Sequence, residues 1–325
     1  MGEQYELGTI ETSEKLIEEL YINLRRGVNF WSNITHQTPQ ARMGYIGQHL
    51  VSVVTGFRGG KSGARGYDLI LSPTEHAEIK TCYRVDQLGA CKNCRNIVSS
   101  LETVCAVCNS NEIERKDDSK WLISIRNDDE FAKILIPKFY YFVLFEFEKI
   151  HDTENNNIIA SIWKVNSKSE GFAYCMIDYF LNIRASSVSK APFNMWPHSL
   201  KFYLTCPELI YRSKIRHDNK IETIIFPTLG NTYIDEFSSL REFSRATTLT
   251  KEALQKSIDS LFNVKLSKNL SKNELINFFD KNRRLYDIPS LQVCNTLASN
   301  IYLPLIKSRE KHIPDEIKRY FSDFE

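Results

Sequence analysis

Two short stretches, Gly66-Tyr67-Asp68-Leu69-Ile70-Leu71 and Ala77-Glu78-Ile79-Lys80, carry the most information about the fold of this chain. Both combine strand-forming apolar residues with isolated charges, and a Ser-Pro-Thr segment at residues 72–74 separates them. The pattern predicts two paired strands over residues 67–71 and 76–83. We therefore expect a hairpin that brings charged side chains of two neighbouring strands together.

The charged residues of this hairpin form a candidate catalytic site. Side chains two residues apart in a strand share a face, so Glu78 and Lys80 project together, and Asp68 lies alongside if the strands pair. Two carboxylates suit Mg²⁺, which prefers oxygen ligands, and an ammonium beside them can orient or polarise an attacking water. We therefore assign Asp68 and Glu78 as magnesium ligands and Lys80 as the third catalytic residue. The alternative is that all three are ordinary surface residues of an amphipathic hairpin.

A basic, glycine-rich loop at residues 57–66 precedes the first of these strands. It holds four glycines, the cations Arg58, Lys61 and Arg65, and no acid. Such cations can contact phosphates or base edges, and their position just before Asp68 favours a role in DNA binding. The alternative is a solvated loop without a ligand.

Four cysteines follow the hairpin in an insertion over residues 86–120. Cys91 and Cys94 form one Cys-x-x-Cys pair, and Cys105 and Cys108 form a second pair after ten intervening residues. Two such pairs can complete a tetrahedral, closed zinc site, which is structural and not catalytic. A redox dithiol and an iron–sulfur cluster are the alternatives, and the module could also merely brace the sheet or a dimer. Zinc would stabilise an excursion too short to fold on a core of its own.

The composition is typical of a folded protein, and the net charge is too small to attract a polyanion to the protein as a whole. Hydrophobic residues make up 42% of the chain, and 42 basic against 40 acidic residues give a formal net charge of +2. Any surface for nucleic acid must therefore be local. No apolar run approaches the roughly 20 residues of a membrane-spanning helix. The first residues lack the basic and apolar regions of a signal peptide, and the scattered cysteines favour a reducing cytoplasm.

The remaining pattern predicts an α/β fold. The aromatic and apolar segment 139–147 is expected to be the central strand, because it is apolar on both faces. The other expected elements are helices over residues 38–56 and 172–183, strands over 158–165, 200–204 and 221–226, and C-terminal helices over 251–262, 272–281, 290–301 and 315–321. We expect a core over residues 1–230 that includes the 86–120 insertion, followed by a helical C-terminal region over residues 231–325.

The spacing of Asp68, Glu78 and Lys80 resembles the PD-(D/E)xK nuclease superfamily, and the surrounding sequence is most similar to type II restriction endonucleases. The resemblance covers residues 38–185. This chain has Gly66-Tyr67-Asp68 at the position of the family's proline-aspartate signature, so the proline is absent. It implies a mixed central sheet flanked by helices, with a zinc-ribbon-like insertion in this chain. Some members add an acidic residue from the helix before the first strand. The nearest residue here is Gln48, which we do not assign as a ligand.

This resemblance also implies the activity. It indicates a Mg²⁺-dependent, sequence-specific endonuclease of prokaryotic cytoplasm, acting as a homodimer on double-stranded DNA and leaving 5′-phosphates. A repair or recombination nuclease of the same fold is the nearest alternative. A non-catalytic zinc-containing DNA-binding protein, in which the helical C-terminal region recognises DNA, is the alternative from another class.

Overall fold

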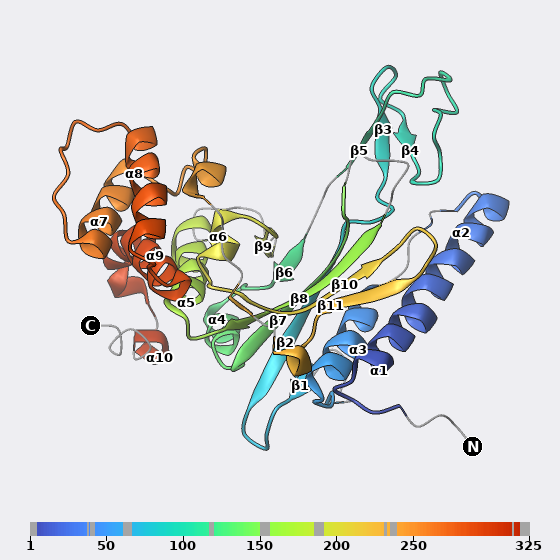
Figure 1. Ribbon diagram of the computed structural model, residues 1–325, viewed down its shortest axis with the longest axis horizontal. Helices are drawn as coiled ribbons and strands as arrows, with labels where there is room; N and C mark the ends of the chain where they lie inside the picture. The colour runs from blue at the N-terminus through green and yellow to red at the C-terminus, as the bar shows by residue number, and fades with distance from the viewer. Residues whose placement is uncertain are drawn as a thin grey trace. The chain divides into compact units, whose positions relative to one another are not determined.

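A computed structural model describes residues 5–37, 39, 43–60, 67–116, 120–149, 157–184, 192–230, 233–234, 239–313 and 315–318 (Figure 1). The chain divides into two compact units that interleave along the sequence. The first comprises residues 1–120, 141–163 and 209–232, and the second comprises residues 121–140, 164–208 and 233–325. None of the helices within these described ranges is both long and apolar enough to cross a membrane.

The largest sheet has the strand order β1–β2–β7–β8–β10–β11. These strands are β1 (Leu69–Ile70), β2 (His76–Tyr83), β7 (Phe139–Phe147), β8 (Ile158–Asn166), β10 (Glu208–Ile215) and β11 (Ile221–Ile225). Residues 140–145 of β7 are all buried, as expected for a strand covered on both faces. The Arg84 backbone N–H, directly after β2, donates to the Phe145 carbonyl at 2.8 Å.

Helices from the N-terminal part of the chain cover this sheet in the first unit. They are α1 (Ile10–Leu16), the π-helical segment η1 (Ile17–Ile22), α2 (Asn23–Thr35) and α3 (Met43–Thr55). Tyr21, buried in η1, packs on Phe145 with ring centroids 4.8 Å apart. Helix α3 packs against β2 and buries an apolar face that includes Leu50 and Val54. The β1–β2 hairpin is therefore built on a strand that a helix covers.

The cysteine insertion forms a small separate sheet with the order β4–β3–β5. Its strands are β3 (Gly89–Cys91), β4 (Ile97–Val98) and β5 (Ile113–Arg115). Its base is tied to the rest of the unit at both ends. Arg25 Nη2 of α2 donates to Asp86 Oδ1 at 2.7 Å, and the Lys120 N–H donates to Cys82 Sγ of β2 at 3.1 Å. Both ends of the insertion therefore lie close to β2, at the points where the chain enters and leaves it.

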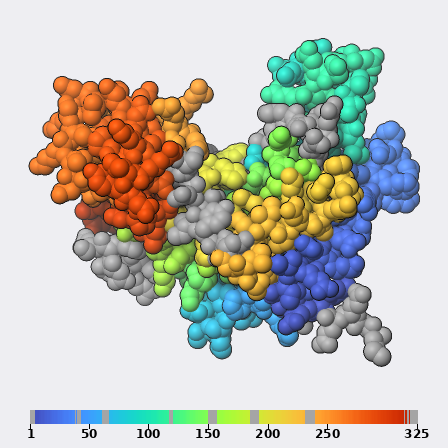
Figure 2. Space-filling model, in the orientation of Figure 1, coloured from blue at the N-terminus to red at the C-terminus, as the bar shows by residue number. Residues whose placement is uncertain are grey.

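The second unit is mainly helical. Its helices are α4 (Asp128–Ile134), α5 (Glu170–Asp178) with the π-helical extension η3 (Tyr179–Arg184), α6 (Leu200–Tyr203), α7 (Lys251–Phe262), α8 (Lys272–Leu285), α9 (Ser290–Lys307) and α10 (Asp315–Lys318). Strands β6 (Trp121–Ile123) and β9 (Phe193–Met195) pair antiparallel, and β12 covers Tyr233–Ile234. Short 3₁₀ turns are η4 (Pro227–Leu229), in the first unit, η5 (Leu240–Phe243) and η6 (Glu310–His312). The helices after residue 250 (orange to red) reach the surface in Figure 2.

These elements confirm the predicted α/β class, with a central sheet, flanking helices, a helical C-terminal region and a four-cysteine cluster. The strand predicted at residues 200–204 is wrong. This segment begins helix α6, because the Ser199 hydroxyl accepts from the Phe202 N–H at 3.2 Å and caps a helical turn. The division into residues 1–230 and 231–325 stays a prediction.

Candidate active site and metal centre

The hairpin of β1 and β2 places Asp68 opposite Glu78. The two strands pair antiparallel with Leu69 opposite Ala77 and Ile70 opposite His76. Continuing this register by one residue puts Asp68 across from Glu78. The predicted pairing of the two strands is confirmed, and the two carboxylates lie close enough for Asp68 to affect the titration of Glu78.

Both carboxylate oxygens of Asp68 accept hydrogen bonds. The Gln48 side-chain amide of α3 donates to Oδ1 at 2.8 Å, and the Ile79 backbone N–H donates to Oδ2 at 2.9 Å. One donor comes from the helix and the other from the neighbouring strand. The carboxylate is therefore oriented by two separate elements, as a metal ligand requires.

Glu78 and Lys80 share one face of β2 and pair with each other. Lys80 Nζ lies 3.2 Å from Glu78 Oε2, and about a quarter of each side chain is exposed. Burial raises the pKa of Glu78, Lys80 lowers it, and the neighbouring Asp68 carboxylate raises it again, so the net shift is upward. Two carboxylates that repel each other in a half-buried site fit a divalent cation, whose charge would relieve this repulsion.

Helix α3 approaches β2 closely at Gly47. A Cβ atom at this position would lie 1.9 Å from Thr81 Oγ1 and 2.9 Å from the Thr81 Cβ. Only a residue without a side chain therefore allows the observed contact between the helix and the strand. Because Gln48 follows Gly47, this contact also sets the distance between the Gln48 amide and Asp68.

A stacked aromatic pair borders the candidate site. His76 lies on the same face of β2 as Glu78. Its ring stacks on that of Tyr67, with centroids 3.2 Å apart. Burial lowers the pKa of His76. Tyr67 directly precedes Asp68, so the stack joins the start of β2 to the chain segment that carries this carboxylate.

The basic loop is described only in part. Arg58 is exposed, and its carbonyl accepts from the Ile70 N–H of β1 at 3.0 Å. This bridge ties the beginning of the loop to the β1–β2 hairpin. Lys61 and Arg65 lie outside the described residues, so their predicted role stays a prediction.

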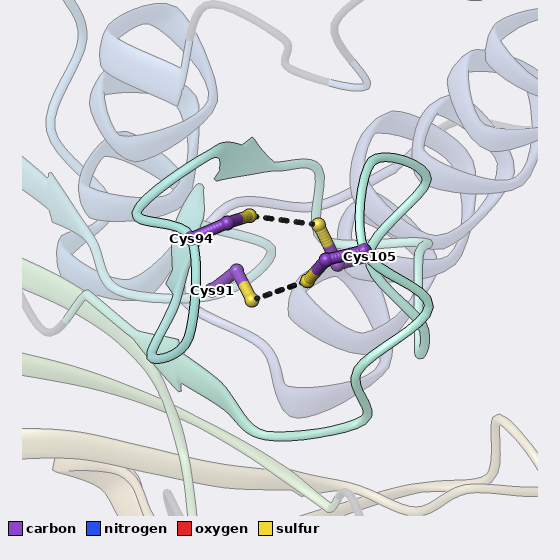
Figure 3. Close-up of side chains that lie close together, drawn as sticks. Cys91, Cys94 and Cys105 are labelled. Carbon is purple, nitrogen blue, oxygen red and sulfur yellow. Dashed lines mark hydrogen bonds between the residues drawn. The ribbon is translucent and has the colours of Figure 1, made fainter.

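The four cysteines of the two Cys-x-x-Cys motifs converge on one point. All four Sγ atoms lie within 4.8 Å of one another. Cys91 Sγ is 3.4 Å from Cys108 Sγ, and Cys94 Sγ is 3.5 Å from Cys105 Sγ (Figure 3). Four sulfurs at about 2.3 Å from a tetrahedral zinc would lie roughly 3.8 Å apart, close to this spacing.

The two cysteine pairs are held in matching turns. In the first, the Cys91 N–H donates to the Asn96 carbonyl, and the Arg95 N–H donates to the Cys91 carbonyl, both at 2.9 Å. The second repeats this with Ser110 and Asn109 bonded to Cys105 at 2.9 and 2.8 Å. Arg95 and Asn109 adopt left-handed φ angles of 62° and 54°, respectively. Each turn therefore presents its two sulfurs in the same way to a shared centre.

Two of the four thiol groups have a lowered pKa, which favours the thiolate form that binds metal. The Cys94 backbone N–H lowers the pKa of Cys91 to about 6, and the Cys108 and Val107 N–H groups lower that of Cys105. Although the Ser110 N–H lowers the pKa of Cys108, the neighbouring sulfurs raise it to about 12. Four soft donors with mutual repulsion fit one zinc ion, and no carboxylate or histidine joins the cluster among the described residues.

A comparison with known protein families identifies the family of this chain. The model of the MamI restriction endonuclease family matches residues 30–239, well over half of the chain. This chain belongs to the MamI restriction endonuclease family. Restriction endonucleases are nucleases that act on DNA, so the predicted nuclease class is confirmed at the level of the family. No curated protein and no solved structure matches the chain.

The part of the chain that matches the MamI restriction endonuclease family contains every candidate site residue. It includes α3, the hairpin of β1 and β2, and the four cysteines, and it ends before α7, α8 and α9. Gln48 and His76 both lie at the candidate site, although the sequence analysis assigns neither of them a functional role. The two-residue spacing to Glu78 is the signal that places His76 on this face. Gln48 carries no such signal, because its contact depends on the packing of α3.

Proposed function

We propose that this chain is a type II restriction endonuclease that hydrolyses double-stranded DNA at a specific sequence with Mg²⁺. The observation that carries the proposal is the juxtaposition of Asp68, Glu78 and Lys80 on the β1–β2 hairpin. This arrangement supports membership of the PD-(D/E)xK nuclease superfamily, in which an acid on one strand faces a Glu-x-Lys on the next.

The three side chains would divide the chemistry between them. Asp68 and Glu78 would hold Mg²⁺, which when bound neutralises charge on the phosphate and increases the acidity of water. The hydrogen bonds from Gln48 and Ile79 fix the Asp68 carboxylate in one orientation. Lys80 would orient the attacking water and stabilise negative charge as it accumulates on the phosphate oxygens. Its position beside Glu78 places the ammonium within the same small site.

The rest of the proposal concerns assembly and contacts. A homodimer would cut both strands of a symmetric site, as the family resemblance implies. Zinc held by Cys91, Cys94, Cys105 and Cys108 would be structural, because its four sulfur ligands leave no open position. Arg58, Lys61 and Arg65 would contact the DNA backbone next to the hairpin.

A plasmid digest tests this function directly. The purified chain incubated with plasmid and Mg²⁺ should yield discrete fragments with 5′-phosphate ends, and a chelator should stop the reaction reversibly. Folded Asp68→Ala and Lys80→Ala variants should lose cleavage by at least about a hundredfold while still shifting the DNA in a gel. Near-parent cleavage by these variants would show that the site is misassigned.

The same digest separates the alternatives. Random degradation of the plasmid would favour a repair or recombination nuclease. A mobility shift without cleavage, at any Mg²⁺ concentration, would favour a non-catalytic DNA-binding protein.

A further inference from the structure

Helix α2, at the edge of the first unit (Figure 1), carries an apolar stripe on its exposed side. Its inner side is fixed to the fold, where Ser32 is buried and Arg25 bonds to Asp86. On the outer side, five large apolar side chains each expose between 41% and 60% of their surface. They are Leu20 of η1 and Leu24, Phe30, Trp31 and Ile34 of α2. Spacings of three, four and seven residues place them on one face, which soluble helices normally bury.

The stripe is free of charged side chains. The same arc of the helix also carries Asn23 and Gly27, both exposed and both uncharged. Charged and polar residues begin only at its borders, which are formed by Glu19, Arg26 and Thr35. The outer side of α2 therefore has an apolar centre and a polar rim, as protein interfaces do.

The exposed area is sufficient for a specific interface. The rings of Phe30 and Trp31 contact each other edge to face, with centroids 5.5 Å apart, and yet 60% of each residue stays exposed. With about 200 Å² for a large side chain, the five exposed fractions amount to roughly 500 Å² per chain. Two such stripes in contact would bury on the order of 1,000 Å², which reaches the lower limit for a specific protein interface.

The stripe is symmetric about Gly27. Leu24 and Phe30 are three residues away on either side, and Leu20 and Ile34 are seven residues away. A Cβ at Gly27 would meet nothing within 4 Å, so the packing of the chain itself does not require a glycine there. The missing side chain allows another backbone to approach the centre of the stripe closely.

We propose that α2 packs antiparallel on α2 of a second copy of this chain, about a two-fold axis at Gly27. This arrangement places Leu20 opposite the second copy's Ile34 and Leu24 opposite its Phe30. The same residues meet from both sides, as a two-fold interface requires. The inference rests on the proposed function, because it supplies the contact between the two copies of the proposed homodimer.

The chemistry of the stripe favours a second copy over a membrane or DNA. Pairing about Gly27 also places Asn23 opposite Trp31, whose indole N–H can donate to an amide oxygen. Helices that lie on membranes carry lysine and arginine on their polar face, and DNA contacts need cations or other donors directed at phosphates. Here the single cation Arg26 and the acid Glu19 border the stripe on the same side, so neither polyanion is matched.

The test measures the oligomeric mass of full-length variants. Gly27→Leu adds bulk at the proposed axis, while leucine favours the helix more than glycine does. Ile34→Glu places a charge within the stripe. Asn33→Glu is the matched control, because it introduces the same charge at the adjacent exposed position outside the stripe. Analytical ultracentrifugation over a concentration series, without Mg²⁺ or DNA, gives the mass, and circular dichroism checks the fold.

The parent and Asn33→Glu should have twice the mass of one chain at micromolar concentration. Gly27→Leu and Ile34→Glu should raise the dissociation constant of the dimer by at least about tenfold. In the first variant the two helices can no longer approach, and in the second a charge is buried without a partner. Circular dichroism should be unchanged in all three variants, since each position is exposed in the single chain.

Four results would overturn the inference. They are a monomeric parent, a parent that forms assemblies larger than a dimer, parent-like dimers in both stripe variants, or an equal loss in Asn33→Glu. The outcome is separable from the nuclease activity. A monomeric parent that cuts plasmid at a specific sequence would contradict this interface alone, whereas a dimer that depends on the stripe but never cleaves DNA would contradict the proposed nuclease alone.

Discussion

The Gln48 side-chain amide of α3 donates a hydrogen bond of 2.8 Å to Asp68 Oδ1. The Ile79 N–H occupies the other oxygen at 2.9 Å. Asp68 is therefore positioned by a helix on one side and by its partner strand on the other. A neutral amide at this position orients the carboxylate without adding a third negative charge to a site that already holds two.

Replacing Gln48 should impair catalysis without affecting DNA binding. Gln48→Leu removes the donor but keeps a side chain of similar size, so Asp68 loses one of its two fixed contacts. Loss of such a supporting partner usually lowers metal affinity or activity by about 10- to 100-fold. We expect a lower single-turnover rate and a higher Mg²⁺ concentration for half-maximal cleavage. His49→Ala, on the next and exposed position of α3, should behave like the parent; an unchanged Mg²⁺ requirement in Gln48→Leu would disprove the role.

Neutralising Glu78 should stabilise the metal-free protein. Burial and the Asp68 carboxylate raise the pKa of Glu78 in the folded state, although Lys80 opposes this shift. A carboxyl whose folded pKa is raised destabilises the fold once the pH is high enough to ionise it. Glu78→Gln should therefore melt at a higher temperature than the parent at pH 7 to 8. The difference should shrink as the pH falls toward the ordinary pKa of a glutamate.

Mg²⁺ provides the control for this prediction. The ion should raise the melting temperature of the parent, because it binds only the folded state, and it should have a much smaller effect on Glu78→Gln. A scanning calorimeter measures both changes without any reference to cleavage. Equal stabilisation of the two proteins by Mg²⁺ would remove Glu78 from the ligand set.

Removing a cysteine ligand should release zinc and unfold the insertion. The buried cluster of the insertion consists of Cys91, Val98 and Cys105 with Ile113 packed against it, so two of its members are candidate zinc ligands. The parent should contain about one zinc per chain, and Cys91→Ser should contain far less. Limited proteolysis of this variant should begin within residues 86–120. Cys175→Ala, at a cysteine of α5 outside the cluster, should keep its zinc; a parent without zinc would contradict the assignment.

Much of the fold could be predicted because local patterning and tertiary structure agree. Residues 139–147 are apolar on both faces and form the buried strand β7, and residues 251–262 have the periodicity and boundaries of α7. The β1–β2 hairpin follows from alternation and a Pro-containing turn. Each of these elements can be recognised from residues that are close together in the sequence.

Other features depend on contacts between distant segments and leave little local signal. Leu200–Tyr203 is apolar enough for a strand, but a Ser199 cap turns it into a helix. Gln48 reaches Asp68 only because Gly47 lets α3 approach β2. The equivalent turns of the two cysteine pairs were predictable from spacing, whereas the Arg25–Asp86 pair that ties the insertion to α2 was not.

The close contact between α3 and β2 yields a last prediction, with a matched control in the same helix. Gly47→Ala would place a Cβ 1.9 Å from Thr81 Oγ1, so the helix or the strand must shift. Overpacking of this kind typically costs about 1–3 kcal/mol in the free energy of unfolding. At Gly44, a Cβ meets nothing within 4 Å. Gly44→Ala should therefore leave stability unchanged or raise it by up to about 1 kcal/mol.

Gly47→Ala and Gly44→Ala make the same substitution in one helix, so a difference between them reports the contact with Thr81 and not helix propensity. A shift of α3 in Gly47→Ala would also move Gln48 away from Asp68, so cleavage should fall together with stability, whereas Gly44→Ala should cut DNA like the parent. Adding Thr81→Ala to Gly47→Ala removes Oγ1 and Cγ2 and should recover part of both losses. Urea denaturation and single-turnover cleavage of the four proteins measure these effects. Parent-like stability of Gly47→Ala, or no recovery in the double variant, would show that this contact does not position the helix.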